Sequence, residues 1–283
     1  MYSNHIAVKV DAALALTELL EHDAAVEFIR PGLGNILKVF LKIMDEIDFE
    51  DLVKALRRIV DVYEDDIAPY AISLCQKLSE AHIRLINSKG EYENQDSETS
   101  LTADGLMTAI RRVLNSISGK FVELYPQLEE ILENSIIICL TEAGETSTDE
   151  GLTCIAELIY NQNHVSQRMW QHFGRIIETY LGDSGVLDDY IGAASVPLIN
   201  FMVKAPQEFK MAPYFNGETP LALTFKFIEK IFNVGHELED EITSMCAVTL
   251  IMAILEHLGE GLEQYLHPIN QFYLNELSRG PDT

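Results

Sequence analysis

Three short stretches contain residue types that enzymes use, and each departs from the catalytic pattern. Gly182-Asp183-Ser184-Gly185 carries a serine in a setting that some proteases share, but it joins two predicted helices and no β-barrel is available to hold a triad. His236-Glu237 begins a run without the second histidine of a zinc-binding helix. Glu18 and His22 have the spacing of two metal ligands on one helix face, but no second such pair accompanies them. We therefore predict no catalytic residue, no cofactor and no metal site.

The net charge of the chain limits the kinds of partner that it can bind. Its 283 residues contain 45 Asp and Glu against 20 Lys and Arg, which gives a net charge of −25. Such a chain repels phosphate backbones, so direct binding of nucleic acid is not expected. It attracts basic partners and speeds their encounter in a salt-dependent way. Solubility alone is the simpler explanation of the same acidic excess.

Cysteine placement and hydropathy indicate where the chain resides. Cys75, Cys139, Cys154 and Cys246 stand far apart in apolar segments, which favours buried free thiols in a reducing compartment. No uninterrupted apolar run approaches about 18 residues, so we expect no membrane span. The N-terminus has no signal-peptide pattern and enters an apolar helix at once, as a cut from a longer chain would.

Apolar residues recur at helical spacing along nearly the whole chain. Leu52, Leu56 and Ile59 share one face, for example, and no stretch alternates like a half-buried strand. An apolar residue, a spacer, a proline and an apolar run recur near the start of every second helix. The marker positions are 31, 69, 126, 174 (a glycine, without proline), 220 (a weaker copy) and 268, separated by 38, 57, 48, 46 and 48 residues. Two helices in about 40–47 residues are typical of HEAT and armadillo repeats.

We therefore predict an all-α fold, an α-α superhelix (HEAT/ARM-type solenoid) of about six helix pairs, as one continuous array over residues 1–283. The helices that follow the markers are named A and their partners B. The A helices are predicted at 27–46, 67–88, 119–142, 165–182, 219–234 and 262–278. The B helices are predicted at 6–21, 48–64, 101–117, 148–162, 187–204 and 238–258.

The long spacing of 57 contains a polar stretch at 89–100, which we predict to be a flexible acidic insert. Its carboxylates are Glu91, Glu93, Asp96 and Glu98. A solvated loop and an acidic tongue that engages a basic ligand are both compatible with this composition.

Two further features have open interpretations. Trp170, the only tryptophan, either packs between repeats or anchors a peptide on the surface. The pairs Arg57-Arg58 and Arg111-Arg112 stand at the same place in consecutive B helices. One arginine of each pair either bridges to acids on the neighbouring repeat or is solvated.

The order of several stretches resembles the importin-β (karyopherin-β) nuclear transport receptors, most closely the importin seven and eight class. The resemblance covers essentially the whole chain, as the middle part of a family about three times longer. It depends on the segments 8–16, 49–53, 63–71, 101–106 and 167–171, which read VKVDAALAL, FEDLV, YEDDIAPYA, LTADGL and QRMWQ.

This resemblance implies a shuttling receptor of cytoplasm, nucleus and nuclear pore. It implies basic protein cargo such as ribosomal proteins or histones, Phe-Gly nucleoporin contacts on the outer A helices, and the GTPase Ran bound mainly through repeats outside this chain. An exposed apolar patch would mark the nucleoporin contacts. No membrane partner and no direct nucleic acid are expected.

The acidic starts of the B helices are the candidate cargo contacts, because B helices line the concave side of such solenoids. The same carboxylates also suit helix capping and the helix dipole, which accounts for much of the acid. The candidates are Asp48, Glu50, Asp51, Asp104, Asp149, Glu150, Asp188, Asp189, Glu239, Asp240 and Glu241. The alternatives are a HEAT scaffold subunit of a phosphatase or vesicle-coat complex, an enzyme with a site between helices, and repeats that only join two active ends.

Overall fold

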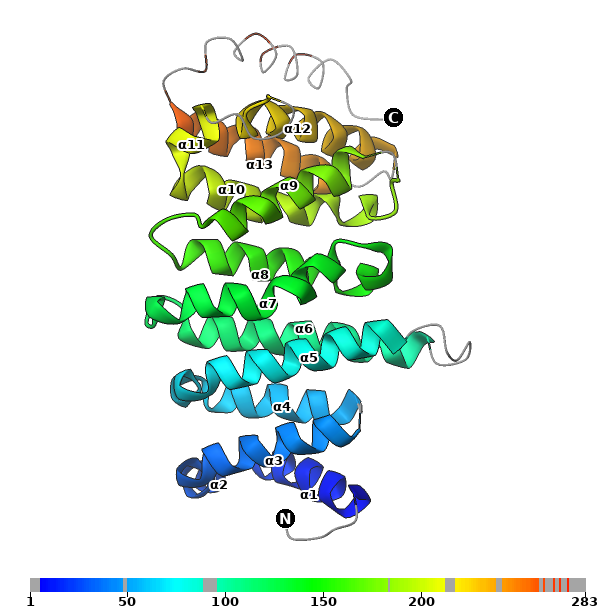
Figure 1. The fold of residues 1–283 in the computed structure, drawn as a ribbon, viewed down its shortest axis with the longest axis vertical. Helices are drawn as coiled ribbons and strands as arrows, with labels where there is room; N and C mark the ends of the chain where they lie inside the picture. Colours follow the sequence, from blue (N-terminus) through cyan, green and yellow to red (C-terminus); the bar gives the residue numbers. More distant parts are fainter. Residues whose placement is uncertain are drawn as a thin grey trace. The chain divides into compact units, whose positions relative to one another are not determined.

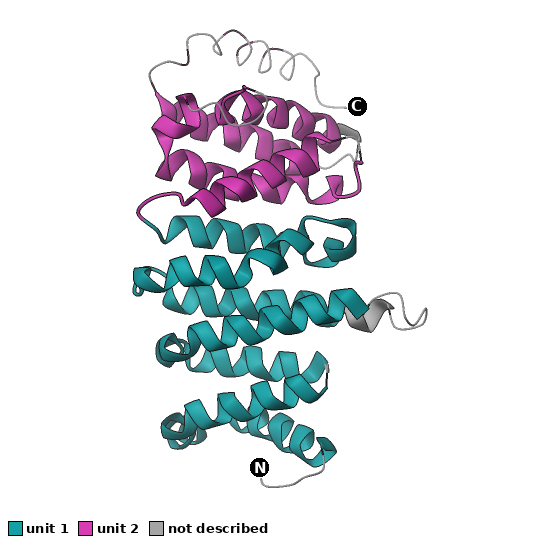
Figure 2. Cartoon of the chain, viewed as in Figure 1, with its two compact units in different colours: residues 1–162 teal, residues 163–283 magenta. Residues whose placement is uncertain are grey.

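The chain forms two compact units, Met1–Gln162 and Asn163–Thr283 (Figure 2). The computed structural model describes residues 6–47, 50–88, 96–182, 184–211, 217–237 and 241–259, and four single positions beyond them. Over these residues the regular elements are helices and no β-strand occurs, so the predicted all-α class is confirmed. A single continuous array over 1–283 stays a prediction.

Unit 1 consists of two layers of helices (Figure 1). The A layer contains, in order, α3 (Leu33–Glu46), α5 (Ala71–Ser88) and α7 (Tyr125–Cys139). The B layer contains α1 (Ile6–Leu19), α4 (Glu50–Val62), α6 (Asp96–Ile117) and α8 (Thr148–Tyr160). Consecutive helices within each layer contact one another, and each A helix packs on the B helix that follows it. This is the paired-helix repeat that the sequence predicts.

Short 3-10 turns lead into the A helices of unit 1. Arg30–Gly32 follows α2 (Asp23–Ile29) and precedes α3, Ala68–Tyr70 precedes α5, and Val122–Leu124 precedes α7. Pro31 and Pro69 lie in the first two of these turns, and Pro126 lies in the first turn of α7. Proline fits there because its missing N–H has no partner to lose in a first turn. Further 3-10 turns at Glu64–Asp66 and Glu142–Ser147 complete the connections.

Unit 2 repeats the two-layer packing. Its A helices, α9 (Gln167–Leu181) and α12 (Pro220–Glu237), contact each other, as do its B helices, α10 (Ser195–Lys204) and α13 (Glu241–Leu258). Both A helices have side-chain caps. The Ser166 hydroxyl accepts from the Met169 amide at 3.1 Å, and the Thr219 hydroxyl accepts from the Ala222 amide at 3.2 Å.

Apolar side chains at helical spacing fill the space between the layers. Leu52, Leu56 and Ile59 on α4 are at most 1% exposed, as their shared face predicts. Burial of each such side chain stabilises the fold by about 1.5–3 kcal/mol. Three of the four cysteines are buried and all four are free thiols, with Cys246 partly exposed.

Trp170 belongs to an aromatic cluster inside unit 2. Its ring centroid lies 5.7 Å from that of Phe173, 5.1 Å from Phe201 and 6.4 Å from Phe209. Phe173, Phe201 and Phe209 are fully buried. Trp170 itself is partly exposed, so it packs on this cluster with part of its ring open to solvent, and both interpretations of Trp170 stay predictions.

Several predicted boundaries are wrong. Helix α6 begins at Asp96, so part of the predicted insert at 89–100 is helical, and Asp104 lies two turns inside the helix. Gly174 stands in the middle of α9, because this helix starts from the Ser166 cap and needs no proline. Asp188–Ala194 is a 3-10 helix ahead of α10. The short helix α11 (Pro206–Met211) was not predicted. The predicted helix at 262–278 and residues 89–95 lie almost wholly outside the described residues.

Candidate functional site: carboxylates of the B helices

The start of α8 packs against the middle of α6 through an ion pair. Arg111 Nε lies 2.5 Å from Glu150 Oε2, and Arg111 Nη2 donates to Glu150 Oε1 at 3.2 Å. The Thr108 hydroxyl also donates to Glu150 Oε1, at 3.2 Å. The two charged side chains are only 28% and 16% exposed. Glu150 is therefore a structural link between adjacent repeats, and little of its carboxylate faces solvent.

Asp104 and Asp149, two more of the predicted cargo contacts, lie within charge range of Glu150. The pKa of the Asp104 carboxyl is raised, first by burial and then by the charge of Glu150, while Arg57 and Arg111 oppose the shift. Burial and Glu150 also raise the pKa of Asp149, although part of that residue is open to solvent. Burial disfavours the charged form of each carboxyl, and the repulsion from Glu150 adds to that effect. We name Asp104, Asp149 and Glu150 the α6–α8 carboxylate cluster.

The arginines of α6 connect three B helices. Arg111 pairs with Glu150 on α8, and Arg112 Nε lies 3.6 Å from Asp61 Oδ1 on α4. Of the two interpretations of these arginines, the bridge between neighbouring repeats is confirmed for this pair. Arg57 on α4 acts on Asp104 through its charge.

The other predicted carboxylates occupy separate places. Glu50 and Asp51 lie on α4 beside Lys54, whose Nζ is 2.6 Å and 3.7 Å from them. In unit 2, Asp188 pairs with Lys230 at 2.9 Å, whereas Asp189 and Glu241 are exposed. Asp48, Glu91, Glu93, Glu239 and Asp240 lie outside the described residues, as do the side chains of Asp96 and Glu98 on α6.

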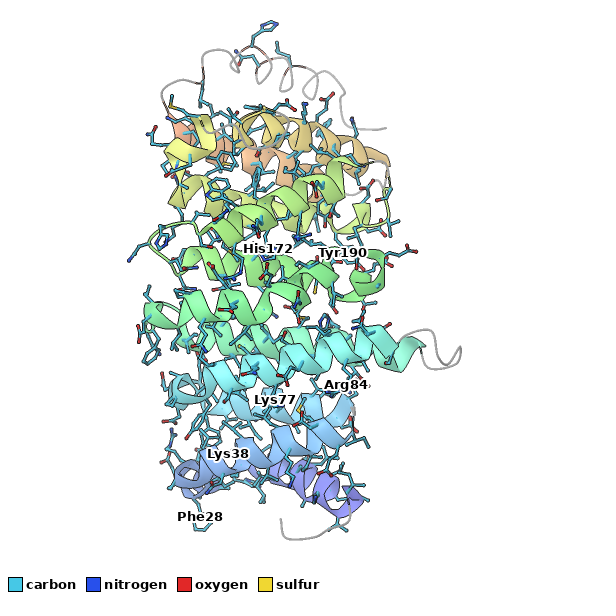
Figure 3. The ribbon with its side chains drawn as sticks, in the orientation of Figure 1. Phe28, Lys38, Lys77, Arg84, His172 and Tyr190 are labelled. Carbon is cyan, nitrogen blue, oxygen red and sulfur yellow. The ribbon has the colours of Figure 1, made fainter. Side chains whose placement is uncertain are left out.

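Acid is not confined to the B layer. Helix α8 carries three carboxylates and no basic residue, but so does α7 in the A layer. Helix α4 balances three carboxylates with Lys54, Arg57 and Arg58. The A helices α3 and α5 carry basic residues such as Lys38, Lys77 and Arg84 (Figure 3). Helix α8 is therefore acidic as expected of a B helix, but α7 is equally acidic and α4 is balanced, so the composition of these helices does not set the B layer apart.

Within the described residues the main A helices show no exposed apolar patch, and the nucleoporin contacts stay a prediction. Phe28 and Val122 are exposed in the predicted A segments 27–46 and 119–142. None of the large exposed apolar side chains of the described residues belongs to α3, α5, α7, α9 or α12. Several lie on the B helix α13 instead: Ile242, Met245, Val248, Met252 and Leu255. By length and composition alone, α13 is apolar enough to cross a membrane, with 39% of it buried. Core helices of soluble proteins pass the same test, and α13 packs on α12 and α10.

The stretches whose residue types resemble those of enzyme sites form helix ends and turns in the structure. Gly182 ends α9, its amide bonded to the Glu178 carbonyl at 3.1 Å, and Gly185 turns the chain with φ of +62°. Helix α1 ends at Leu19, so Glu18 and His22 do not share a helix. Within the described ranges no three His, Cys, Asp or Glu side chains gather as metal ligands.

One feature of unit 1 was missed from the sequence. The turns before α3, α5 and α7 enclose a pocket of about 510 Å³ lined in part by Leu33, Tyr70 and Phe121. The recurring proline phrase marked these turns. Only the fold shows that three of them meet.

The fold defines the class of this chain, an all-α protein built from repeated helix pairs. The chain belongs to the importin-β family. Its curated relatives are importin-β-like proteins, which are 25–32% identical to it over most of its length. The resemblance inferred from the sequence is confirmed. No family model matches the chain, and no solved structure matches it.

Three relatives show the extent of the similarity. An importin beta-like SAD2 homolog of Arabidopsis thaliana is 32% identical over 70% of this chain and 19% of its own length. A probable importin-7 homolog of Dictyostelium discoideum is 26% identical over 86% of the chain and 21% of its own length. Importin-8 of Mus musculus is 26% identical over 98% of the chain and 26% of its own length. The chain thus spans about a fifth to a quarter of the length of these relatives.

Proposed function

We propose that this chain acts in nuclear transport as an importin-β-like receptor chain that binds basic protein cargo through carboxylates of its B helices. The relationship to importin-β-like proteins supports the general role. The observation that supports basic cargo is the α6–α8 carboxylate cluster, in which Asp104 and Asp149 lie within charge range of Glu150, the carboxylate that Arg111 pairs with. A lysine or arginine of a cargo supplies the positive charge that this cluster lacks.

Binding of this kind is multivalent. Each exposed ion pair contributes about 0–1 kcal/mol, so affinity comes from several carboxylates acting together. Asp149, Asp189 and Glu241 are exposed and are the members best placed for contact in their respective units. Glu150 and Asp188 already pair with Arg111 and Lys230, so they contribute less to cargo binding.

The remaining elements of the proposal follow from the family. Histones and ribosomal proteins are the cargo class, Phe-Gly nucleoporins contact the outer A helices, and the GTPase Ran binds mainly through repeats outside this chain. The receptor shuttles between cytoplasm and nucleus through the pore. We expect a Phe-Gly repeat column to retain the chain, whereas a scaffold subunit outside transport would pass through it.

A charge-matched pair of variants tests the cargo surface. One variant neutralises Asp149, Asp189 and Glu241, and its control neutralises Glu130, Glu178 and Glu229. The control carboxylates are exposed on the A helices α7, α9 and α12, with one in unit 1 and two in unit 2, as in the test set. We expect the first variant to bind purified core histones about tenfold more weakly than the control. Equal losses would mean that the net charge alone attracts the cargo.

A further inference from the structure

A pocket in unit 1 lies apart from the carboxylates proposed for cargo. It forms where the 3-10 turns before α3, α5 and α7 follow one another along one side of the unit (Figure 1). Its volume is about 510 Å³, within the range of about 300–1,000 Å³ that holds small ligands or anchoring side chains. Three consecutive repeats contribute to its lining, so it exists only in the folded array.

The interior of the pocket is mainly apolar. Leu33 of α3, Pro69 and Tyr70 of the second turn, and Phe121 and Leu124 of the third line it. Tyr70 and Phe121 remain partly exposed, which leaves aromatic surface accessible from the opening. Partly exposed aromatic side chains in a concavity are the usual anchors of protein recognition.

The opening of the pocket is acidic. Asp65 belongs to its lining, and its side chain is 86% exposed, with one carboxylate oxygen 2.9 Å from Lys120 Nζ. Asp66 pairs with Arg30, which also bonds to Glu27 at 3.0 Å. The exposed carboxylate of Glu64 also acts on Lys120 through its charge. The rim thus has more carboxylates than cations and complements a basic ligand.

We propose that this pocket binds an extended peptide segment of a partner protein, with a large apolar side chain against Tyr70 and Phe121 and an adjacent lysine or arginine on Asp65. Asp65 is 86% exposed and Lys120 contacts its Oδ1, so the incoming cation adds to this pair through the other carboxylate oxygen. This binding site goes beyond the proposed cargo surface, because it is a shaped pocket with an apolar anchor.

The wall formed by Tyr70 depends on a glycine. A Cβ atom added to Gly34 on α3 would lie 2.6 Å from the Tyr70 hydroxyl oxygen. The Tyr70 ring therefore fits where only glycine leaves room. Gly34→Ala displaces this ring from the pocket wall while favouring the helix, since alanine is the better helix former.

Fluorescence polarisation with three labelled peptides tests the proposal on the full chain. The first peptide has one phenylalanine between two lysines in a Gly-Ser background. The second has glutamines in place of the lysines, and the third has serine in place of the phenylalanine. We expect the first to bind about fivefold more tightly than the second at physiological salt, and the third to show no saturable binding.

Protein variants locate the site. Asp65→Asn lowers affinity for the lysine peptide about fivefold and leaves the glutamine peptide unchanged. Glu229→Gln, which removes the same charge from the exposed face of α12 in unit 2, outside the carboxylates proposed for cargo, changes neither. Gly34→Ala weakens both phenylalanine peptides, and an unchanged melting temperature shows that the fold persists. Equal affinity of the lysine and glutamine peptides, or lysine-peptide binding indifferent to both Asp65→Asn and Gly34→Ala, overturns the proposal.

Discussion

Arg111 on α6 and Glu150 on α8 form an ion pair at 2.5 Å that joins two adjacent repeats of unit 1. The pair gives Glu150 a structural role where the sequence suggested a cargo contact. Near this pair, Asp104 is influenced by the charge of Arg57 and, less strongly, by that of Arg111, whereas Asp149 is influenced by Glu150. Stability and charge at the α6–α8 carboxylate cluster are therefore linked.

Loss of Arg111 should destabilise unit 1. Arg111→Ala leaves the mostly buried Glu150 carboxylate without its cation beside two other carboxylates, so we expect a loss of about 2 kcal/mol in the free energy of unfolding. Urea unfolding followed by circular dichroism measures it. Arg58→Ala is the matched control, because Arg58 is exposed on α4 and its loss should change stability by less than about 0.5 kcal/mol. Equal unfolding midpoints for the two variants would contradict the structural role of the pair.

His172 should make unit 2 sensitive to acid. The pKa of this histidine is lowered to about 4, chiefly by burial and also by the charges of Arg175 and Arg168. Below the ordinary value of 6.5 the unfolded chain binds a proton that the folded chain does not, so stability is complete above this pH and falls as pH decreases toward 4. Between pH 7 and pH 5 the loss is about 2 kcal/mol.

Substitution isolates the contribution of this histidine. His172→Leu should unfold with a shallower dependence on pH over the same interval, because the proton uptake of the unfolded state is removed. Urea midpoints at pH 7 and pH 5 for both proteins give the comparison. Identical pH dependence in the variant would assign the acid sensitivity to other groups.

Cargo binding should also depend on pH through Asp104 and Asp149. Because their pKa values are raised, these carboxyls lose their charge at higher pH than ordinary ones. Affinity for core histones should therefore fall as pH is lowered from 7 to 5, about threefold more in the wild type than in Asp104→Asn/Asp149→Asn. An equal fall in the two proteins would exclude this cluster from the cargo surface.

The contact between α7 and α8 should not tolerate a larger residue at position 151. A Cβ atom on Gly151 would lie 2.4 Å from Cys139 Cβ, so Gly151→Ala should destabilise the protein by about 1–3 kcal/mol. Gly105→Ala is the control on α6, where the nearest atom would be 3.3 Å away. We expect it to be nearly neutral, since alanine favours the helix. Similar losses for both would show that the α7–α8 contact is adaptable.

Much of the fold follows from the sequence, because helical spacing of apolar residues is a local signal. It located α4 and α9 to within two or three residues. The helical spacing failed at two places where other local signals compete with it. The polar start of α6 has the composition of a loop, and α9 begins at a Ser166 cap, so no proline marks its first turn. Pairing between repeats is a different matter. Arg111 and Arg112 were visible as a pair, but only packing shows that they face α8 and α4.

The candidate site was less predictable for the same reason. Position at a helix start makes candidate cargo contacts of Glu50, Asp51 and Asp188. In the fold, however, Lys54 pairs with the first two and Lys230 pairs with Asp188. Sequence position does not reveal which carboxylates are already paired. The pocket at Tyr70 and Phe121 combines residues from three repeats, which no spacing rule connects.

Zero-length carbodiimide crosslinking of the chain to purified core histones, read by mass spectrometry, tests the central proposal most directly. This chemistry joins only a carboxylate and a lysine that are in contact. We expect crosslinks at Asp149, Asp189 and Glu241, which are exposed at the starts of predicted B helices. Crosslinks confined to Glu130, Glu178 and Glu229 on the A helices would contradict the account.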